Sequence, residues 1–212
     1  MTDLGDTYLY LVSPHRLNAG LLAELIPELA EAGVDIVQLR EKEMEAGDVI
    51  RAAEPILAVC VEAGIPFVIN DRPDIALAVG ATGVHVGQND MPVEWVRRLC
   101  PDRLVGLSTH APEEIDSAVG LGPALDYIAV GPVNATPTKP GRAGTGLDLV
   151  RHAARTITAV PWFVTGGMNR STIPAVLEAG GRRVVVVRAI TEAPDPISVA
   201  AELKEMLLSA SG

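Results

Sequence analysis

Short apolar runs alternate with longer amphipathic stretches along almost the whole chain. The apolar runs predict buried β-strands at residues 7–13, 34–39, 66–69, 83–87, 104–108, 127–130, 161–165 and 184–187. Leu, Ile and Val recur at helical spacing in residues 17–32, 46–63, 73–80, 92–100, 112–121, 147–158, 170–179 and 196–208. Gly33, Gly64 and Gly80 stand where three of these helices are expected to end.

Strict alternation of eight strands with eight helices predicts an α/β protein with a closed parallel barrel, the (βα)8 or TIM-barrel fold. The strands are nearly all apolar, as expected when both faces of a sheet are covered. A flat doubly wound sheet is the alternative, but no Gly-x-Gly-x-x-Gly pattern follows the first strand. The length of 212 residues predicts a single domain that spans residues 1–212.

Charge and composition narrow the function classes. The formal net charge of −10 argues against nucleic acid or a membrane surface as a partner, but it is compatible with a small phosphorylated molecule. The first residues show no signal-peptide pattern and no run is long enough to span a membrane, so we expect a cytoplasmic protein. Cys60 and Cys100 have no metal-ligand spacing and are expected to be buried thiols.

Residues 66–90 hold two predicted strands that each run into a carboxylate, Asp71 and Asp90. Parallel strands joined by a helix end on the same rim, so the two carboxylates are expected side by side. A hard cation such as Mg²⁺ would relieve their repulsion. The alternative is that both are ordinary capping or turn aspartates.

Other polar residues also fall at strand ends, where βα barrels build their active sites. They are Gln38, Arg40, Lys42, Asn70, Gln88, Ser108, His110, Thr136, Thr138, Lys139, Arg142 and Arg188, together with Gly166 and Gly167. His85 lies within a strand and is expected to be a hydrogen-bonded structural residue, and capping the next helix is slightly favoured for His110. The polar loop at residues 134–146 is either a lid over the site or a disordered connector.

Two anion sites follow from this placement. Gly166 and Gly167, with Val187 and Arg188, resemble the phosphate site that barrels often build after their last two strands. Arg40, Lys42 and Lys139, added to a metal on the aspartates, suit a diphosphate. Taken singly, these residues have simpler interpretations: Arg40 and Lys42 as a solvated pair around Glu41, and Lys139 as an ordinary loop lysine. Their joint placement favours a site.

The chain has no evident Ser–His–acid set, thiol nucleophile or general base. This absence fits a reaction whose nucleophile carries no proton. A diphosphate leaves readily once Mg²⁺ and basic side chains neutralise it, and a second, phosphate-anchored substrate can attack the carbon left behind. The chemistry indicated is alkyl transfer with loss of pyrophosphate.

The chain resembles the thiamine phosphate synthase family. The motifs that carry the resemblance run in the family's order and are QLREK at 38–42, IND at 69–71, GVHVGQND at 83–90, GLSTH at 106–110, AVGPV at 129–133, TPTK at 136–139, TGG at 165–167 and VVRAI at 186–190. The resemblance implies a (βα)8 barrel that joins 4-amino-2-methyl-5-(diphosphooxymethyl)pyrimidine to 4-methyl-5-(2-phosphoethyl)thiazole, giving thiamine phosphate and pyrophosphate.

The resemblance also implies roles for single residues. Asp71 and Asp90 would hold Mg²⁺ on the diphosphate. The pyrimidine diphosphate would be bound by Gln38, Arg40, Lys42, Asn70, Ser108 and Lys139, of which Arg40, Ser108 and Lys139 are expected to be catalytic. The thiazole phosphate would contact Thr136, Thr138, Gly167, Val187 and Arg188. Leu39, Glu41 and Pro137, inside the same motifs, complete the expected substrate-binding set.

In the family, the bond between the pyrimidine methylene and oxygen breaks first, and the ring's amino group stabilises the resulting cation. The neutral thiazole nitrogen then attacks, which agrees with the missing base. This chain departs from the family at Arg188, where many members have serine, and at Met168, where a β-branched residue is more usual. Arg188 either contacts the thiazole phosphate or forms a surface ion pair.

Two other functions stay open. A thiazole tautomerase, a related isomerase, needs no diphosphate site and would use His110 as its catalyst. A barrel that binds thiamine phosphate without chemistry would be expected to lack Asp71 and Asp90. The expected partners are the two small-molecule substrates, and a homodimer is left open.

Overall fold

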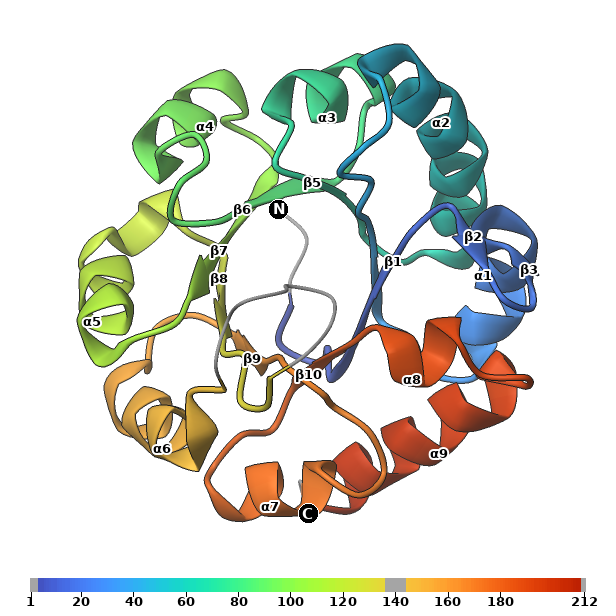
Figure 1. The fold of residues 1–212 in the computed structure, drawn as a ribbon. Helices are drawn as coiled ribbons and strands as arrows, with labels where there is room; N and C mark the ends of the chain where they lie inside the picture. Colours follow the sequence, from blue (N-terminus) through green and yellow to red (C-terminus); the bar gives the residue numbers. More distant parts are fainter. Residues whose placement is uncertain (1–3, 136–143, 211–212) are drawn as a thin grey trace.

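A computed structural model of the chain describes residues 4–135 and 144–210. Parallel strands close into a barrel, and helices form a ring around it (Figure 1). The barrel strands are β1 (Leu9–Ser13), β4 (Ile36–Leu39), β5 (Phe67–Asn70), β6 (Gly83–Val86), β7 (Leu104–Thr109), β8 (Tyr127–Val130), β9 (Trp162–Val164) and β10 (Val184–Val186). Each strand pairs with its neighbour in the chain, and β10 pairs with β1 to complete the ring. The predicted (βα)8 fold is confirmed.

Helices between the strands cover the outer face of the barrel. They are α1 (Leu22–Glu31), α2 (Ala46–Ala63), α3 (Pro73–Val79), α4 (Val93–Leu99), α5 (Pro112–Gly120), the 3₁₀ turn η1 (Gly122–Ala124), α6 (Gly146–Thr156), α7 (Ile173–Glu178), α8 (Arg188–Thr191) and α9 (Pro196–Ser209). Their apolar faces and the outward strand residues form one continuous core. The predicted helices at 46–63, 73–80 and 112–121 agree with α2, α3 and α5 to within one residue.

Two local predictions are wrong. The helix expected from residue 17 begins only at Leu22, because a short antiparallel ribbon of β2 (Arg16–Leu17) and β3 (Gly20–Leu21) precedes it. Gly20, with φ +146°, permits the tight turn of this ribbon. The short helix α8 was not expected, because its four residues are too few to show a helical period.

Alternation along the strands separates an apolar barrel interior from the layer above it. Successive strand residues point to opposite faces, so every second residue points into the barrel. Its lower interior is filled by Tyr10, Val12, Ile36, Val68, Leu104, Tyr127, Phe163 and Val185, together with Leu4 from the N-terminal segment. Gly106 on β7 pairs in register with Tyr127 on β8 and leaves room for its ring.

The N-terminal end of the barrel is tied by Asp35. One carboxylate oxygen of Asp35 accepts hydrogen bonds from the backbone N–H groups of Tyr8 and Leu9 at 2.7 and 2.9 Å. Lys204 on α9 donates to both oxygens at 2.5 and 2.6 Å. Asp35 therefore joins the start of β1 and the start of β4 to the last helix.

We predict that Gly106→Ala destabilises the barrel. A Cβ atom at this position would lie 2.1 Å from Cζ of Tyr127, so the ring must move inside a packed interior. Overpacking of this kind costs about 1–3 kcal/mol in the free energy of unfolding. Urea denaturation followed by circular dichroism measures the loss.

Gly120→Ala at the end of α5 is the matched control. An added Cβ meets no atom within 4 Å there, and alanine stabilises helices relative to glycine by up to about 1 kcal/mol. The control should unfold at the same urea concentration as the parent or at a higher one. Equal urea midpoints for Gly106→Ala and the parent would contradict the packing described for Tyr127.

Candidate active site

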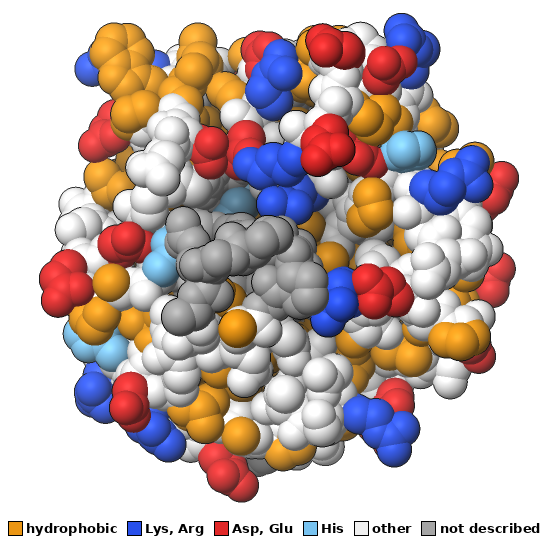
Figure 2. All heavy atoms as spheres, viewed as in Figure 1, with side chains coloured by type: hydrophobic (Ala, Val, Ile, Leu, Met, Phe, Trp, Pro, Cys, Tyr) orange, Lys and Arg blue, Asp and Glu red, His pale blue; other side chains and the backbone are white. Residues whose placement is uncertain are grey.

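A cavity of about 400 Å³ opens at the C-terminal ends of the barrel strands. It lies directly above the apolar interior, because the next inward residue of each strand reaches it: Gln38 follows Ile36, Asn70 follows Val68, and Thr165 follows Phe163. The residues predicted from strand ends that line the cavity are Gln38, Arg40, Lys42, Asn70, Asp71, Asp90, Ser108, Gly166, Gly167, Val187 and Arg188. On this face of the molecule, basic and acidic side chains lie side by side around the centre (Figure 2).

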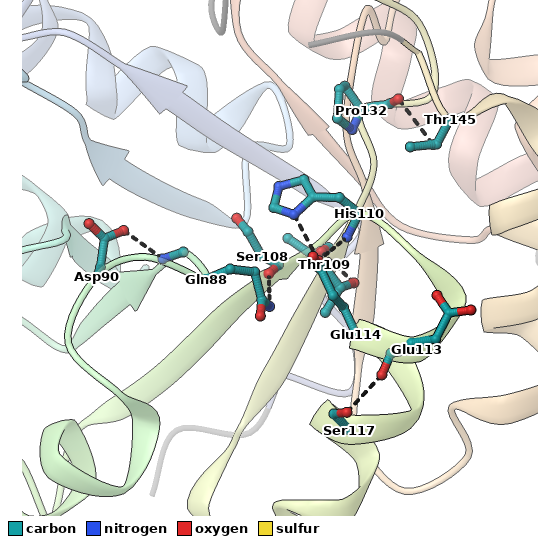
Figure 3. A network of polar contacts seen from close by, with 12 residues as sticks. Gln88, Asp90, Ser108, Thr109, His110, Glu113, Glu114, Ser117, Pro132 and Thr145 are labelled. Carbon is teal, nitrogen blue, oxygen red and sulfur yellow. Dashed lines mark hydrogen bonds and ion pairs between the residues drawn. The ribbon is translucent and has the colours of Figure 1, made fainter.

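The two predicted aspartates lie on one wall of this cavity. Asp71 directly follows β5 with φ +61°, a backbone conformation that is uncommon for a residue other than glycine. Its N–H donates to the backbone oxygen of His85 at 2.7 Å, which fixes the turn against β6. Asp90 is held by the N–H of Gly87, which donates to Oδ2 at 2.8 Å (Figure 3).

The carboxylates of Asp71 and Asp90 influence each other, and Lys42 lies beside them. Burial raises the pKa of Asp71, the neighbouring Asp90 carboxyl raises it further, and the ion pair with Lys42 opposes both effects. Two acids in contact disfavour the doubly ionised state unless positive charge is added. This wall of the cavity is therefore built to receive a cation.

The donor set fits Mg²⁺. Among the described residues there is no cluster of three or more His, Cys, Asp or Glu side chains that would hold a metal without help. Mg²⁺ is commonly held by one or two carboxylates, with water and substrate phosphates as the other ligands. Asp71 and Asp90 match that pattern, and Arg40 and Lys42 line the same cavity.

Gln38 and Ser108 are held from below by a chain of buried hydrogen bonds. Gln38 Nε2 donates to the Tyr10 hydroxyl at 2.6 Å, and the Tyr10 and Tyr127 oxygens lie 2.9 Å apart. His85 bonds to Tyr127 through Nδ1 at 3.1 Å and to Ser108 Oγ through Nε2 at 2.8 Å. His85, which lies on β6, is hydrogen-bonded as predicted, to side chains on β7 and β8.

The loops after β9 and β10 form the opposite wall. Gly166 and Gly167 have φ +104° and +70°, and a Cβ on Gly166 would lie 2.5 Å from the Pro132 backbone. Val187 caps α8, whose first N–H groups have no partner within the helix. Arg188 lines the cavity and also lies 3.7 Å from Glu192, one turn along. Both readings left open for Arg188 therefore have a structural basis.

Several predicted residues do not line the cavity with their side chains. Leu39 is buried in the outer core. Glu41 accepts from the His15 backbone N–H at 2.7 Å, and its carboxylate lies 2.6 Å from the His15 ring. Gln88 donates to the Ser108 backbone oxygen at 2.7 Å (Figure 3). Leu39 and Glu41 would have to contact substrate through their backbones.

His110 is also not among the residues that line the cavity. Its backbone N–H donates to Glu114 at 2.7 Å, and its ring lies 2.9 Å from the same carboxylate, at the start of α5 (Figure 3). The prediction that His110 caps this helix is wrong, because the N-cap residue of α5 is Ala111 and the His110 ring pairs with the Glu114 side chain and not with a helix N–H. Thr136, Pro137, Thr138, Lys139 and Arg142 lie outside the described residues, and so does most of the loop predicted to be a lid.

The sequence did not reveal every residue of the cavity. Tyr10, Asn169 and Glu192 line it but were not predicted, and Met168 was noted only as a departure. Strand alternation would have placed Tyr10 inside the barrel, two residues before Val12. Asn169 lies in a loop and Glu192 directly follows the four-residue helix α8, and no periodic signal marks either position.

Comparison with known proteins identifies the family. The sequence profile described as thiamine monophosphate synthase matches residues 9–190. The chain belongs to the thiamine monophosphate synthase family. A thiamine-phosphate synthase of Acidothermus cellulolyticus is 46% identical, covering 99% of both chains. One from Thermus thermophilus is 47% identical, covering 94% of this chain and 96% of the relative.

A solved structure agrees with this thiamine monophosphate synthase assignment. The thiamine phosphate pyrophosphorylase of Pyrococcus furiosus superposes with a TM-score of 0.86 at 28% identity, and the alignment covers 97% of each chain. The similarity therefore extends over nearly the whole chain.

We predict that Asp71→Asn lowers turnover by about 100-fold or more, because one of the two carboxylates that would hold Mg²⁺ on the leaving diphosphate loses its charge. Asparagine tolerates positive φ, so the fold should be retained. Steady-state kinetics at several Mg²⁺ concentrations, with circular dichroism, measure both effects.

Asp74→Asn is the matched control, since Asp74 pairs with Arg72 outside the cavity lining. This variant should turn over like the parent. Full activity in Asp71→Asn would mean that the metal lies elsewhere.

Proposed function

We propose that this chain forms thiamine phosphate by Mg²⁺-assisted, dissociative loss of pyrophosphate, with the substrate-binding and catalytic residues predicted above. Membership of the family makes the chain an enzyme that condenses the pyrimidine diphosphate with the thiazole phosphate. What we add is how the cavity residues divide the reaction between them.

One observation carries the assignment of roles. A single cavity is lined on one wall by Arg40, Lys42 and the Asp71–Asp90 pair and on the other by the loops after β9 and β10, and we propose that each wall binds an anion. A substrate with a diphosphate and a second substrate with a monophosphate would fit the two walls. Their reacting carbon and nitrogen would then meet between the walls.

At the diphosphate wall, Arg40 and Lys42 would bind phosphate oxygens, and Ser108 would donate a hydrogen bond from the inner end. Lys139, outside the described residues, is proposed to join them. Mg²⁺, when held by Asp71 and Asp90, would supply further positive charge to the leaving group. Asn70, which ends β5 beside Asp71, is positioned to orient the same substrate.

At the second wall, Gly167, Val187 and Arg188 would bind the thiazole phosphate, together with Thr136, Pro137 and Thr138 from the undescribed loop. The carbon–oxygen bond breaks with its electron pair going to pyrophosphate. The lone pair of the thiazole nitrogen then forms the new carbon–nitrogen bond. No proton moves in either step, so the cavity needs no general base.

The other candidate functions have less support. A tautomerase would rely on His110, whose backbone and ring both bind Glu114. A protein that only binds thiamine phosphate has no use for the Asp71–Asp90 pair. No observation favours either function here.

Four wider predictions stay proposals. Residues 1–212 are proposed to form one domain, and the protein is proposed to act in the cytoplasm on small molecules, without nucleic acid or a membrane as partner. The net charge of −10 supports the proposal that neither nucleic acid nor a membrane is a partner. In the described part of the chain, no helix is long and apolar enough to cross a bilayer. A homodimer stays open.

The reaction is tested by mixing the purified protein with both substrates and Mg²⁺. We expect thiamine phosphate, measured as its fluorescent oxidation product thiochrome. EDTA should abolish its formation, and added Mg²⁺ should restore it. Binding of both substrates without product would instead favour a binding protein, and product formed equally in EDTA would remove the metal from the proposal.

Arg188→Ser tests the second wall. If Arg188 binds the thiazole phosphate, the KM for that substrate should rise about tenfold, the usual loss for a hydrogen bond to a charged group. The KM for the pyrimidine diphosphate should stay unchanged. Arg170→Ser is the control, because Arg170 lies 3.7 Å from Glu202 in a similar ion pair outside the cavity lining. Equal KM values for both variants would leave Arg188 a surface ion pair with Glu192.

A further inference from the structure

A chain of polar side chains crosses the barrel directly beneath the cavity. It runs from Gln38 on β4 through Tyr10 on β1, Tyr127 on β8 and His85 on β6 to Ser108 on β7. All five side chains are buried, with exposed fractions between 0 and 7%. Polar groups are rare in such a place unless every one is hydrogen-bonded.

The two tyrosine hydroxyls determine which partner donates in each hydrogen bond of this series. Burial raises the pKa of both phenols well above the ordinary value, so each keeps its single proton. The Gln38 Nε2 group can only donate, so the Tyr10 oxygen accepts from it. Tyr10 then donates its proton in a hydrogen bond to the Tyr127 oxygen, 2.9 Å away, and Tyr127 donates its own to His85 Nδ1.

A neutral imidazole that accepts at one nitrogen donates from the other. His85 therefore donates from Nε2 to the Ser108 oxygen, and the Ser108 proton is left for the cavity. At the other end, Gln38 uses one of its two Nε2–H groups on Tyr10, and its amide oxygen is the acceptor that it can offer to the cavity it lines. If donor and acceptor exchanged roles in one of these hydrogen bonds, they would have to exchange in all of them, because each hydroxyl has only one proton. The two ends always have opposite polarity.

We propose that Tyr10, Tyr127 and His85 are positioning residues that present Gln38 to the pyrimidine as a hydrogen-bond acceptor and Ser108 as a donor. This inference rests on the proposed function. The acceptor suits the exocyclic amino group of the pyrimidine, and the donor suits a phosphate oxygen of the leaving group. Both kinds of charge grow as the carbon–oxygen bond breaks, positive on the amino group and negative on pyrophosphate.

The consequence is kinetic. An acceptor facing an amino group that becomes more positive binds the transition state more tightly than the ground state, and so does a donor facing the leaving oxygen. Losing the fixed polarity should therefore lower kcat more than it raises KM.

Tyr127→Phe tests this, because it removes the middle hydroxyl and keeps the ring. We expect kcat to fall about 10- to 100-fold, as for the loss of other supporting hydrogen bonds, with a smaller change in either KM. Tyr10→Phe is measured in parallel. It breaks the chain one link earlier and keeps the test open if one variant does not fold.

Phe163→Leu is the matched control for packing. Phe163 packs edge-on against both tyrosine rings, with centroids 5.4 and 5.7 Å away, but its side chain takes no part in the hydrogen bonds that join Gln38 to Ser108. We expect a lower melting temperature with kcat retained. An equal fall of kcat in this control would overturn the proposal, since packing alone would then explain the effect. Unchanged kcat in the folded tyrosine variants would also overturn it.

A binding measurement separates this inference from the proposed reaction. Two unreactive pyrimidine diphosphate analogues, with CH₂ in place of the bridging oxygen, are compared with and without the exocyclic amino group. The parent protein should prefer the amino compound, and Tyr127→Phe should lose most of that preference. Equal preference in both proteins would overturn the polarity proposal. Absence of thiamine phosphate from the parent would instead count against the proposed function, because the binding comparison needs no turnover.

Discussion

Closure of the parallel strands is the constraint on which the rest of this structure depends. A closed ring has one inside, and the two-residue repeat of each strand sends every second side chain there. One layer of inward positions is apolar and fills the barrel around Tyr10, Tyr127 and Phe163. The next layer toward the C-terminal ends carries Gln38, Asn70 and Ser108. The floor of the cavity and the core of the barrel are thus adjacent layers of the same strands.

Charge is distributed unevenly over this scaffold. The chain has a net charge of −10, yet Arg40, Lys42 and Arg188 line one cavity. Lys42 pairs with Asp71, which opposes the repulsion between Asp71 and Asp90. A metal ion bound with a diphosphate would take over that part, and Lys42 would then be available to phosphate oxygens.

The sequence predicted the barrel and the cavity wall with Asp71 and Asp90 because both depend on periodic or local signals. Apolar runs gave all eight barrel strands, and strand ends gave Asp71 and Asp90. The hairpin of β2 and β3 was missed since two-residue strands show no period. The position of Leu39 depends on the face of the strand to which it points. The position of Glu41 depends on its contact with His15, a residue distant in sequence. The Tyr10–Tyr127–His85 chain joins strands that are far apart in sequence, and only the closed ring brings them together.

The Asp35 contacts have a consequence for the order in which the molecule is made. Asp35 holds β1 and β4 early in the chain, but its cation, Lys204, belongs to the last helix. During synthesis the first strands can pair long before Lys204 has been translated, and the Asp35 carboxylate then depends on water and backbone N–H groups alone. Protein domains are completed on the ribosome from the N-terminal side. The first β-strands of this barrel therefore reach their final electrostatic environment only after the last helix leaves the ribosome.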